Sequence, residues 1–288
     1  MNLSILYRGP LASCNYGCDY CPFAKHSETP AEHDRDRQAL ERFLDWVTER
    51  QQDQISVFFT PWGEALVRKR YQDAIVYLTN LPNIVKVAIQ TNLSSRLDWT
   101  ERCDKNKLGL WATYHPTQVS RERFLVKCLE LMQRQVRFSV GIVGMKEHAA
   151  DIEAMRQALP PSIYLWINAY KRQPDYYSPE EIRAFTSVDP LFPVNNRYHP
   201  SQGRACRAGE SVISVDGDGT IRRCHFIKTP LGNIYEPGFE EALQPRVCTN
   251  ATCGCHIGYV HMDELKLYEV FGHGVLERIP ARYVSATG

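Results

Sequence analysis

The feature that most constrains the fold is a regular alternation of two apolar periods between residues 3 and 167. Short runs of β-branched and aromatic residues alternate with segments whose apolar residues recur every three or four positions. The expected strands are 3–7, 55–59, 84–89, 108–113, 136–143 and 163–167, and the expected helices are 39–47, 67–78, 120–134 and 148–159. Such alternation indicates βαβ units around a parallel sheet, with functional side chains at the carboxyl ends of the strands. The sequence therefore predicts an α/β fold, either a (β/α) barrel or a Rossmann-like open sheet.

Composition excludes several classes of protein. The chain has 288 residues, of which 43% are hydrophobic and 23% charged, so it is long enough for one large domain or two unequal ones. Thirty-four Lys and Arg against 33 Asp and Glu give a net charge of +1, which provides no bulk attraction for nucleic acid or an acidic membrane. The most apolar stretch, residues 163–170, is far shorter than the roughly 20 residues of a membrane span. The first ten residues also lack the pattern of a signal peptide. We expect a cytoplasmic protein with neither a membrane nor a nucleic acid as partner.

The ten cysteines fall into two groups. Three lie near the start of the chain and five near its end, while Cys103 and Cys128 stand apart and are expected to be small buried hydrophobic residues. In a reducing compartment, dense thiols indicate metal or redox chemistry and not a disulfide framework. The two groups therefore predict two metal sites. The candidate ligands are Cys14, Cys18 and Cys21 in the first group, and Cys206, Cys224, Cys248, Cys253 and Cys255 in the second.

Three residues separate Cys14 from Cys18, and two separate Cys18 from Cys21. Three thiolates suit three irons of a 4Fe-4S cluster and leave the fourth iron open to another ligand. A closed zinc site would need a fourth protein ligand, for which His26 and His33 are the nearest candidates. The spacing, with aromatic Tyr20 directly before the third cysteine, resembles the signature of radical S-adenosylmethionine (SAM) enzymes.

Three further segments resemble the SAM-binding motifs of that family, and each follows an expected strand. Residues 60–64, Thr-Pro-Trp-Gly-Glu, are similar to the family's Gly-Gly-Glu segment with a tryptophan at the first glycine, and residues 91–92 are similar to its Thr-Asn step. Residues 142–147 resemble the adenine-binding segment. The resemblance implies a partial (β/α)6 barrel over residues 1–200. It also implies a 4Fe-4S cluster that binds SAM, with SAM contacts from Tyr20, Trp62, Gly63, Glu64, Thr91, Asn92, Ile142 and Gly144.

Residues 201–288 have a different character. Residues 212–215 and 220–223 flank an Asp-Gly turn and predict a β-hairpin. The spacing of twelve residues, Gly219 and four residues between Cys206 and Cys224 resembles the SPASM and twitch modules, as does the Leu-Gly-Asn-Ile run at 231–234. The resemblance implies a small Cys-rich domain with one auxiliary 4Fe-4S cluster, held by four of the five thiols. The alternative is a structural zinc ribbon that uses the Cys-x-Cys step and His256.

The resemblance implies an enzyme that reductively cleaves SAM to a 5′-deoxyadenosyl radical, which abstracts hydrogen from a substrate C–H bond. An external one-electron donor of flavodoxin or ferredoxin type would supply the electron. Enzymes with this auxiliary module mostly act on peptides or proteins, so a peptide is the leading substrate class. We expect no peptide-binding domain before the first strand. Recognition of a leader segment in the substrate peptide would then need a separate partner or the C-terminal segment. His115, at the end of the fourth expected strand, is the candidate catalytic residue.

Other functions stay open at this point. A radical enzyme acting on a small molecule would fit the same motifs. A tRNA-modifying enzyme would need a local basic patch, for which Arg204, Arg207, Arg222 and Arg223 are candidates. A non-catalytic iron–sulfur electron-transfer protein would explain both groups of thiols, but not Glu64 and Asn92. The sequence leaves undetermined the substrate, the bond formed, the fate of SAM, the oligomeric state and the unused C-terminal cysteine.

Overall fold

A nine-stranded sheet forms the centre of the molecule in the computed structural model, which describes residues 1–23 and 27–282. The first six strands are β1 (Asn2–Tyr7), β2 (Gln54–Phe59), β3 (Ile84–Thr91), β4 (Leu108–Tyr114), β5 (Arg137–Gly144) and β6 (Leu165–Ala169). The helices that follow them are α1 (Pro30–Glu49), α2 (Lys69–Thr79), α3 (Arg121–Gln133), α4 (Ala149–Ala158), α5 (Pro179–Val188) and α6 (Phe192–Asn195). In the part of the chain that is described, no helix combines the length and the apolar character needed to cross a membrane.

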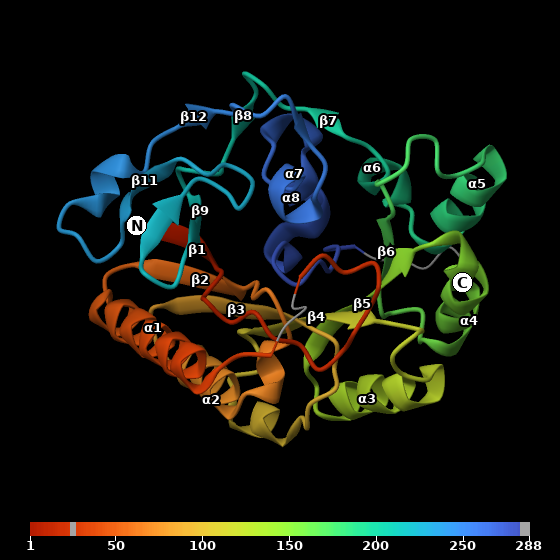
Figure 1. Ribbon diagram of the computed structural model, residues 1–288, viewed down its shortest axis with the longest axis horizontal. Coiled ribbons are helices and arrows are strands. Elements are labelled where there is room, and N and C mark those ends of the chain that lie inside the picture. The colour runs from red at the N-terminus through yellow and green to blue at the C-terminus, as the bar shows by residue number, and fades with distance from the viewer. Residues whose placement is uncertain (24–26, 283–288) are drawn as a thin grey trace.

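The order of the strands decides between the two predicted architectures. Strands β1 to β6 lie side by side in chain order and pair in parallel, for example Leu6 with Phe58 and Phe58 with Ala88. A doubly wound sheet would reverse its order at a switch point, whereas consecutive order is that of a (β/α) barrel. Figure 1 shows the strands as an arc with α1 to α4 on its outer side. The predicted partial (β/α)6 barrel is confirmed, and the Rossmann-like alternative is wrong.

The hairpin predicted in the C-terminal region is confirmed and extends the same sheet. Strand β9 (Val212–Val215) pairs in parallel with β1 and antiparallel with β10 (Thr220–Arg222), which pairs with β11 (Pro230–Asn233). Gly219 adopts a φ of +88° at the turn, in the left-handed region that favours glycine. The short strands β7 (His199–Pro200), β8 (Ala205–Cys206), β12 (Arg246–Val247) and β13 (Thr252–Cys253) complete this region. The boundary near residue 200 stays a prediction, because β9 joins the two parts in one sheet.

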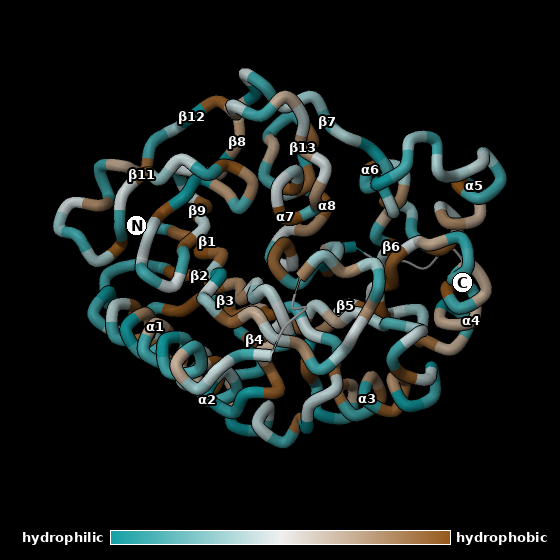
Figure 2. The backbone as a smooth tube through the Cα atoms, in the orientation of Figure 1, coloured by the Kyte–Doolittle hydropathy of each residue, from teal (hydrophilic) through white to brown (hydrophobic). Residues whose placement is uncertain are grey.

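Alternate residues of the strands serve two separate apolar cores. Ile5 and Tyr7 of β1 face the outer helices, where Tyr7 stacks on Phe43 with ring centroids 4.4 Å apart. Leu6, between them, faces the inside of the arc and belongs to a second core. Figure 2 shows the hydrophobic colouring concentrated along the central strands and on the sheet side of the helices. The barrel therefore has a filled interior.

The filling comes from the last part of the described chain, residues 256–280, which we call the inner segment. It contains α7 (His256–Tyr259) and α8 (Leu267–Phe271), which lie inside the arc in Figure 1. Its apolar residues share a core with inward residues of β1 to β4 and of β6. The fully buried carboxylate of Glu277 accepts a hydrogen bond of 2.8 Å from Lys86 Nζ on β3. The inner segment is thus tied to the sheet by one buried ion pair as well as by apolar contacts.

Candidate functional site

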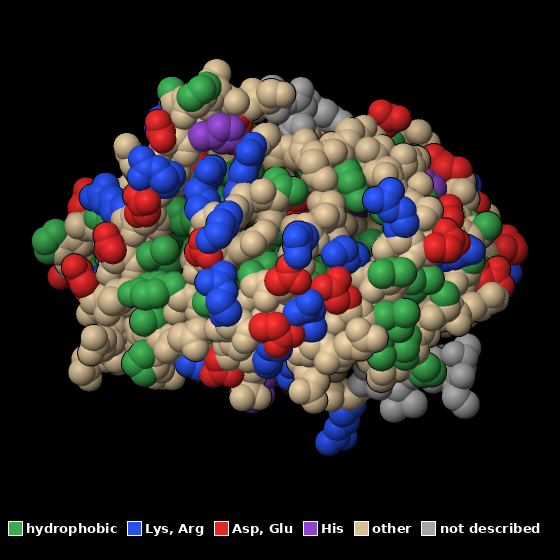
Figure 3. Space-filling model, turned by 90° about the horizontal axis from the view of Figure 1, so that it is seen from below, with side chains coloured by type: hydrophobic (Ala, Val, Ile, Leu, Met, Phe, Trp, Pro, Cys, Tyr) green, Lys and Arg blue, Asp and Glu red, His purple; other side chains and the backbone are tan. Residues whose placement is uncertain are grey.

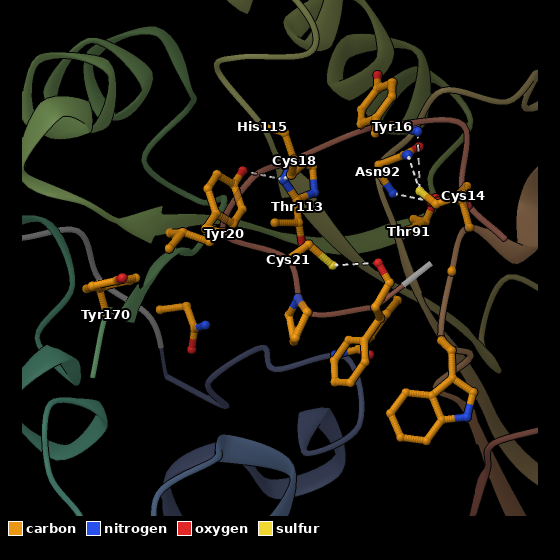
Figure 4. A pocket seen from close by; sticks show the side chains of 18 of the residues that line it. Cys14, Tyr16, Cys18, Tyr20, Cys21, Thr91, Asn92, Thr113, His115 and Tyr170 are labelled. Carbon is orange, nitrogen blue, oxygen red and sulfur yellow. Dashed lines mark hydrogen bonds between the residues drawn. The ribbon is translucent and has the colours of Figure 1, made fainter. Parts of the chain in front are cut away.

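The three N-terminal thiols line one cavity at the carboxyl ends of the strands. Cys14, Cys18 and Cys21 follow β1 and lie around a cavity of about 460 Å³, a usual size for a small-molecule site. Figure 4 shows Cys14 beside Asn92, Cys18 beside His115, and Cys21 between them. Burial raises the pKa of the Cys14 and Cys18 thiols, and each is raised further by neighbouring cysteines. Thiolates are the usual ligands of iron in iron–sulfur clusters, so this donor set suits such a cluster.

Loops after four different strands hold the segment that carries these thiols. The Gly17 amide donates to Gln118 Oε1 at 2.9 Å, and Asn15 Nδ2 donates to Ser94 Oγ at 3.0 Å. On the opposite side, an Arg172 guanidinium nitrogen donates to the Tyr20 carbonyl oxygen at 2.8 Å. The loop after β2 also contacts this segment, because the Glu64 amide donates to the Ser13 carbonyl oxygen at 3.1 Å. The position of the cysteines is therefore set by the barrel and not by their own loop.

The Trp-Gly-Glu segment departs from the Gly-Gly-Glu pattern without losing its close packing. A Cβ atom on Gly63 would lie 1.8 Å from the Ser13 carbonyl oxygen, so only glycine fits there. The first position accommodates the Trp62 side chain because its ring points outward. Trp62 is 37% exposed, and its ring centroid lies 4.7 Å from that of Phe23. The second glycine of the motif is thus needed for backbone contact with the cysteine loop, whereas the first position is free to carry an aromatic ring.

Glu64 lies at the bottom of the cavity with its carboxylate fully buried. It accepts hydrogen bonds from Thr91 Oγ1 at 2.9 Å, from the Asn92 amide at 2.5 Å and from the Leu66 amide at 3.1 Å. Burial raises the pKa of this carboxyl to about 7, although the three donors act in the opposite direction. Glu64 thus joins the loops after β2 and β3, and it offers a negative charge to the cavity near neutral pH.

His115 contacts the cysteine loop through Tyr20. Its Nδ1 atom lies 2.6 Å from the Tyr20 hydroxyl and 3.5 Å from Cys18 Sγ. Burial, and after it the charge of His148, lower the pKa of His115 to about 4, and burial raises that of Tyr20. The neutral His115 ring and the Tyr20 hydroxyl therefore share a hydrogen bond at Nδ1. This contact gives His115 a positioning role for Tyr20, while the catalytic role stays a prediction.

Most of the SAM contacts expected from the sequence line this one cavity, but two do not. Ile142 is fully buried in the outer core, and Gly144 is covered by Ile167 and by Tyr177, whose hydroxyl donates to the Gly144 carbonyl at 2.5 Å. Val143, between them, faces the cavity instead because strand residues alternate. The lining residues that the sequence reasoning missed include Gln90, Thr113, Asn168, Lys171, Arg172 and Tyr198. For all of them except Tyr198, which directly precedes β7, the position at or just after the end of β3, β4 or β6 was the available signal.

The five C-terminal cysteines surround a second cavity of about 590 Å³. It adjoins the first, and both are lined by the same six residues, which we call the shared wall: Pro22, Asn168, Ala169, Lys171, Arg172 and Tyr198. Burial, and after it the neighbouring thiols of Cys224, Cys255, Cys248 and Cys206, raise the pKa of Cys253 to about 12. Thiols grouped around a hollow of this size again suit an iron–sulfur cluster in the kind and number of ligands.

Cys255 differs from the other four thiols in its surroundings. Cys206, Cys224 and Cys253 are each affected electrostatically by Cys248, and Cys253 is also affected by Cys255. Burial raises the pKa of Cys255, while the charges of Lys171, Arg278 and Arg8 act to lower it. Cys255 is exposed and lines the second cavity together with the other four cysteines.

Among the described residues, the alternative zinc ligands His33 and His256 line neither cavity. Cys103 and Cys128 are buried, as predicted. His33 lies 3.3 Å from Glu28, and His26 falls outside the described residues. His256 packs against the Trp111 ring at 5.3 Å and does not line the second cavity. In residues 1–23 and 27–282, no three Cys, His, Asp or Glu side chains are gathered closely enough to hold a single metal ion.

Solved structures with bound SAM (AdoMet) share this fold. Native anSMEcpe with bound AdoMet is 16% identical, with a TM-score of 0.55 over 84% of this chain and 83% of that chain. Native anSMEcpe with bound AdoMet and Kp18Cys peptide is 15% identical, with a TM-score of 0.57 over 85% of this chain and 81% of that chain. SuiB of Streptococcus suis, bound to S-adenosylmethionine, is 12% identical, with a TM-score of 0.58 over 84% of this chain and 66% of that chain.

At these identities the likeness concerns the fold. No protein-family model matches the chain, and no curated protein matches it in sequence. All of these structures contain bound AdoMet or S-adenosylmethionine. The resemblance inferred from the cysteine spacing is therefore confirmed at the level of the fold, which this chain shares with these SAM-bound proteins.

Proposed function

We propose that this protein is a radical SAM enzyme that modifies a peptide or protein. The observation that carries the proposal is the convergence of three motifs, distant in sequence, on one cavity: the cysteines after β1, residues 62–64 after β2 and residues 91–92 after β3. When bound, a 4Fe-4S cluster and SAM supply a 5′-deoxyadenosyl radical able to abstract hydrogen from a C–H bond. Oxidoreductase or transferase chemistry would follow from what the substrate radical then does.

The chain's own residues hold and orient these groups. Cys14, Cys18 and Cys21 would ligate three irons of the cluster, and SAM would bind the remaining iron from the cavity. Glu64 lies deep in the same cavity, where a carboxylate pairs with the SAM ammonium. Asn92 Nδ2 lies 3.9 Å from Cys14 Sγ and 3.1 Å from Asn15 Oδ1, so it links the cluster loop to the end of β3. Tyr20 lines the opposite side, held by His115.

The second cavity holds an auxiliary 4Fe-4S cluster in this proposal. Cys206, Cys224, Cys248 and Cys253 would hold it, because Cys248 affects each of the other three thiols electrostatically. Cys255, which affects Cys253 but is itself affected by three cations, would be the unused cysteine. A substrate at the shared wall would lie beside both cavities, and the auxiliary cluster would supply an electron acceptor there.

A peptide fits better than RNA as the substrate. Arg204, Arg207 and Arg222, three of the four arginines that could form a basic patch, each face an acidic side chain within 3.5 Å: Glu264, Asp263 and Asp216. The fourth, Arg223, donates to the Arg246 and Val247 carbonyl oxygens. A related fold, anSMEcpe, binds a peptide together with AdoMet. An external flavodoxin- or ferredoxin-type donor and a cytoplasmic location complete the proposal.

The direct test is cleavage of SAM by the protein. Protein reconstituted anaerobically with iron and sulfide, reduced with dithionite and given SAM is expected to release 5′-deoxyadenosine and methionine, because one iron of the first cluster is open to SAM. Mass spectrometry detects both products. A reconstituted 4Fe-4S protein that releases neither product would contradict the enzymatic function and would favour a non-catalytic iron–sulfur protein.

Glu64→Gln is expected to weaken SAM binding by about 1.5 to 3 kcal/mol, roughly 10- to 150-fold in Kd, because the amide keeps the shape but loses the charge that pairs with the ammonium. The wild-type affinity should also rise between about pH 5.5 and pH 7 as Glu64 ionises, and this rise should be absent in the variant. Equilibrium dialysis with labelled SAM measures both effects.

Glu28→Gln is the matched control for Glu64→Gln. The Glu28 side chain is also buried, and it accepts hydrogen bonds from the Ala12 amide and Ser13 Oγ, just before the first cysteine. Glu28 does not line the cavity. Its replacement perturbs the loop and leaves the charge near SAM intact. Equal losses of affinity in both variants would mean that Glu64 only supports the loops.

A further inference from the structure

Two arginines of helix α1 depart from the pairing of charges seen elsewhere on the outer helices. On the face that bears these helices, Lys and Arg lie beside Asp and Glu (Figure 3), and on α1 itself Arg37 pairs with Asp34 at 3.5 Å and with Glu41 at 2.9 Å. Arg35 and Arg42 are also exposed, but their side chains form no ion pair and no hydrogen bond in the part of the chain that the structure describes. Both charges are therefore available to a ligand.

The spacing of these two arginines places them on one face of α1. Positions 38, 39 and 42 follow position 35 by three, four and seven residues, which is the period of a helix face. All four positions line a groove of about 690 Å³, which we call the α1 groove. Its opposite wall is the turn of the β9–β10 hairpin, where a Cβ atom on Gly217 would lie 2.6 Å from Pro10 and 3.3 Å from Ala39. The groove is thus formed where the C-terminal hairpin packs closely on the first helix of the barrel.

Arg8, the first residue after β1, lines the same groove and adds a third positive charge to it. It is 9% exposed, and its guanidinium carbon lies 4.0 Å from the centroid of the Trp62 ring. Its buried Nε atom has no acceptor in the described part of the chain. A buried donor without an acceptor is unfavourable, so a ligand that brings acceptor oxygens into the groove would satisfy it.

The acidic residues of the groove do not neutralise these three arginines. Asp216 and Asp218 line it, but Asp216 accepts a 2.9 Å hydrogen bond from Arg222, and Asp218 accepts one from the Thr220 amide at 3.0 Å. Among the described residues, neither carboxylate forms an ion pair with a groove arginine. The α1 groove therefore carries more unpaired positive than negative charge, which favours an anionic ligand.

Trp62 connects the α1 groove to the first cavity, because it lines both. Its ring contacts that of Phe23, which also lines the first cavity and is 43% exposed. Exposed aromatic rings beside a concave site favour apolar side chains of a ligand. A chain that enters the first cavity over these two rings therefore has its neighbouring residues at the α1 groove.

We infer that the α1 groove binds an acidic segment of the substrate peptide, next to an apolar residue that lies on Trp62 and outside the residue that is modified. Arginine binds a carboxylate through two parallel charge-assisted hydrogen bonds. The seven residues from Arg35 to Arg42 span about 10 Å along the helix. This length matches two carboxylates about three residues apart in an extended peptide. The inference rests on the proposed function and adds a sequence preference of the substrate to it.

A flexible peptide fits the groove better than the surface of a folded electron donor does. Arg35 and Arg42 are exposed and accessible to either partner, but Arg8 is nearly buried and is reached only by a narrow chain that enters the groove. Contacts between folded proteins also use roughly 800 Å² of matching surface on each partner, whereas concave sites enclose slender ligands.

The test is affinity selection from a mixture of synthetic octapeptides. The peptides are acetylated and amidated, so that only side chains carry charge, and the protein is immobilised anaerobically with its clusters and SAM at about 0.15 M salt. Peptides with two Asp or Glu residues about three positions apart, and an apolar residue beside the pair, are expected to be enriched about tenfold over those with Asn or Gln at these positions. Arg35→Gln combined with Arg42→Gln should remove this enrichment. This double variant should fold, because both side chains are exposed.

Arg37→Gln is the matched control, because it removes an arginine from the same helix that lines neither the groove nor the two cavities. It should leave the enrichment unchanged, whereas Arg8→Gln should lower it. Equal enrichment by the wild type and the double variant, or equal retention of peptides with one and with two acidic residues, would overturn the inference.

Reduced flavodoxin in place of dithionite tests the other occupant of the groove. If the double variant slows SAM cleavage driven by flavodoxin but not by dithionite, and the wild type enriches no acidic peptide, the groove belongs to the electron donor and the inference is wrong.

SAM cleavage without peptide, measured with dithionite on the same wild-type preparation, separates this inference from the proposed function. Cleavage without acidic enrichment contradicts only the acidic segment. Loss of cleavage removes the enzymatic proposal whatever the peptides show.

Discussion

Replacement of Cys14, Cys18 and Cys21 together by serine is expected to reduce SAM cleavage to background. The three thiols are the only cysteines that line the first cavity within the described chain, so their loss leaves no soft ligand for iron there. 5′-Deoxyadenosine is quantified by mass spectrometry after anaerobic reconstitution and reduction.

The triple variant should still fold, because hydrogen bonds from Asn15, Gly17 and the Tyr20 carbonyl hold the loop without the thiols. Its circular dichroism spectrum should match that of the wild type. Cys103→Ala controls for the loss of a buried thiol elsewhere and should retain cleavage. SAM cleavage by the folded triple variant would end the radical SAM interpretation.

The second large effect concerns iron content. Wild-type protein is expected to bind about eight irons and eight sulfides, and the N-terminal triple variant about four of each, because the two groups of thiols line separate cavities. Cys206→Ala combined with Cys224→Ala should also leave about four, with SAM cleavage retained and substrate turnover lost. Colorimetric iron and sulfide assays on desalted protein give these numbers.

Single variants test the assignment of the four ligands. Cys255→Ala should keep the full iron content, since its thiol lies among cations, whereas Cys253→Ala should lose iron from the auxiliary cluster. Equal iron losses in these two variants would make Cys255 a ligand. One zinc and no iron in the N-terminal triple variant would show instead that the C-terminal region is a zinc module.

Local patterns predicted the sheet well because its strands are short apolar runs bounded by polar residues. Helix starts were less visible. Helix α1 begins at Pro30, nine residues before the expected range, because its first turns carry exposed polar residues and little apolar period. Helix α5 was not predicted at all. Both begin with a capping box, Thr29 with Glu32 and Ser178 with Glu181, and each has a proline at the first helical position. Those caps were the sequence signal.

The candidate site shows where sequence reasoning ends. Cysteine spacing and strand-end motifs identified the three thiols and six further expected SAM contacts that line the first cavity, since parallel strands bring their carboxyl ends together. The position of Arg278 was invisible in the sequence, because no local pattern places it over the rings of Trp111 on β4 and Trp166 on β6. What joins them is the return of the inner segment into the barrel, and that depends on the packing of residues such as Phe271 on inward strand residues. No local pattern encodes such a contact.

The inner segment also has a consequence for biosynthesis. Leu6 of the first strand completes its core with residues such as Leu267, Phe271 and Leu276, which leave the ribosome more than 250 residues later. Contacts of such high sequence separation form late and slow folding. During translation the outer helices can cover one side of the growing sheet, while its other side stays open to chaperones or to association with other nascent chains. Because Cys224, Cys248 and Cys253 also belong to the last quarter of the chain, the second cavity can be completed only late in synthesis.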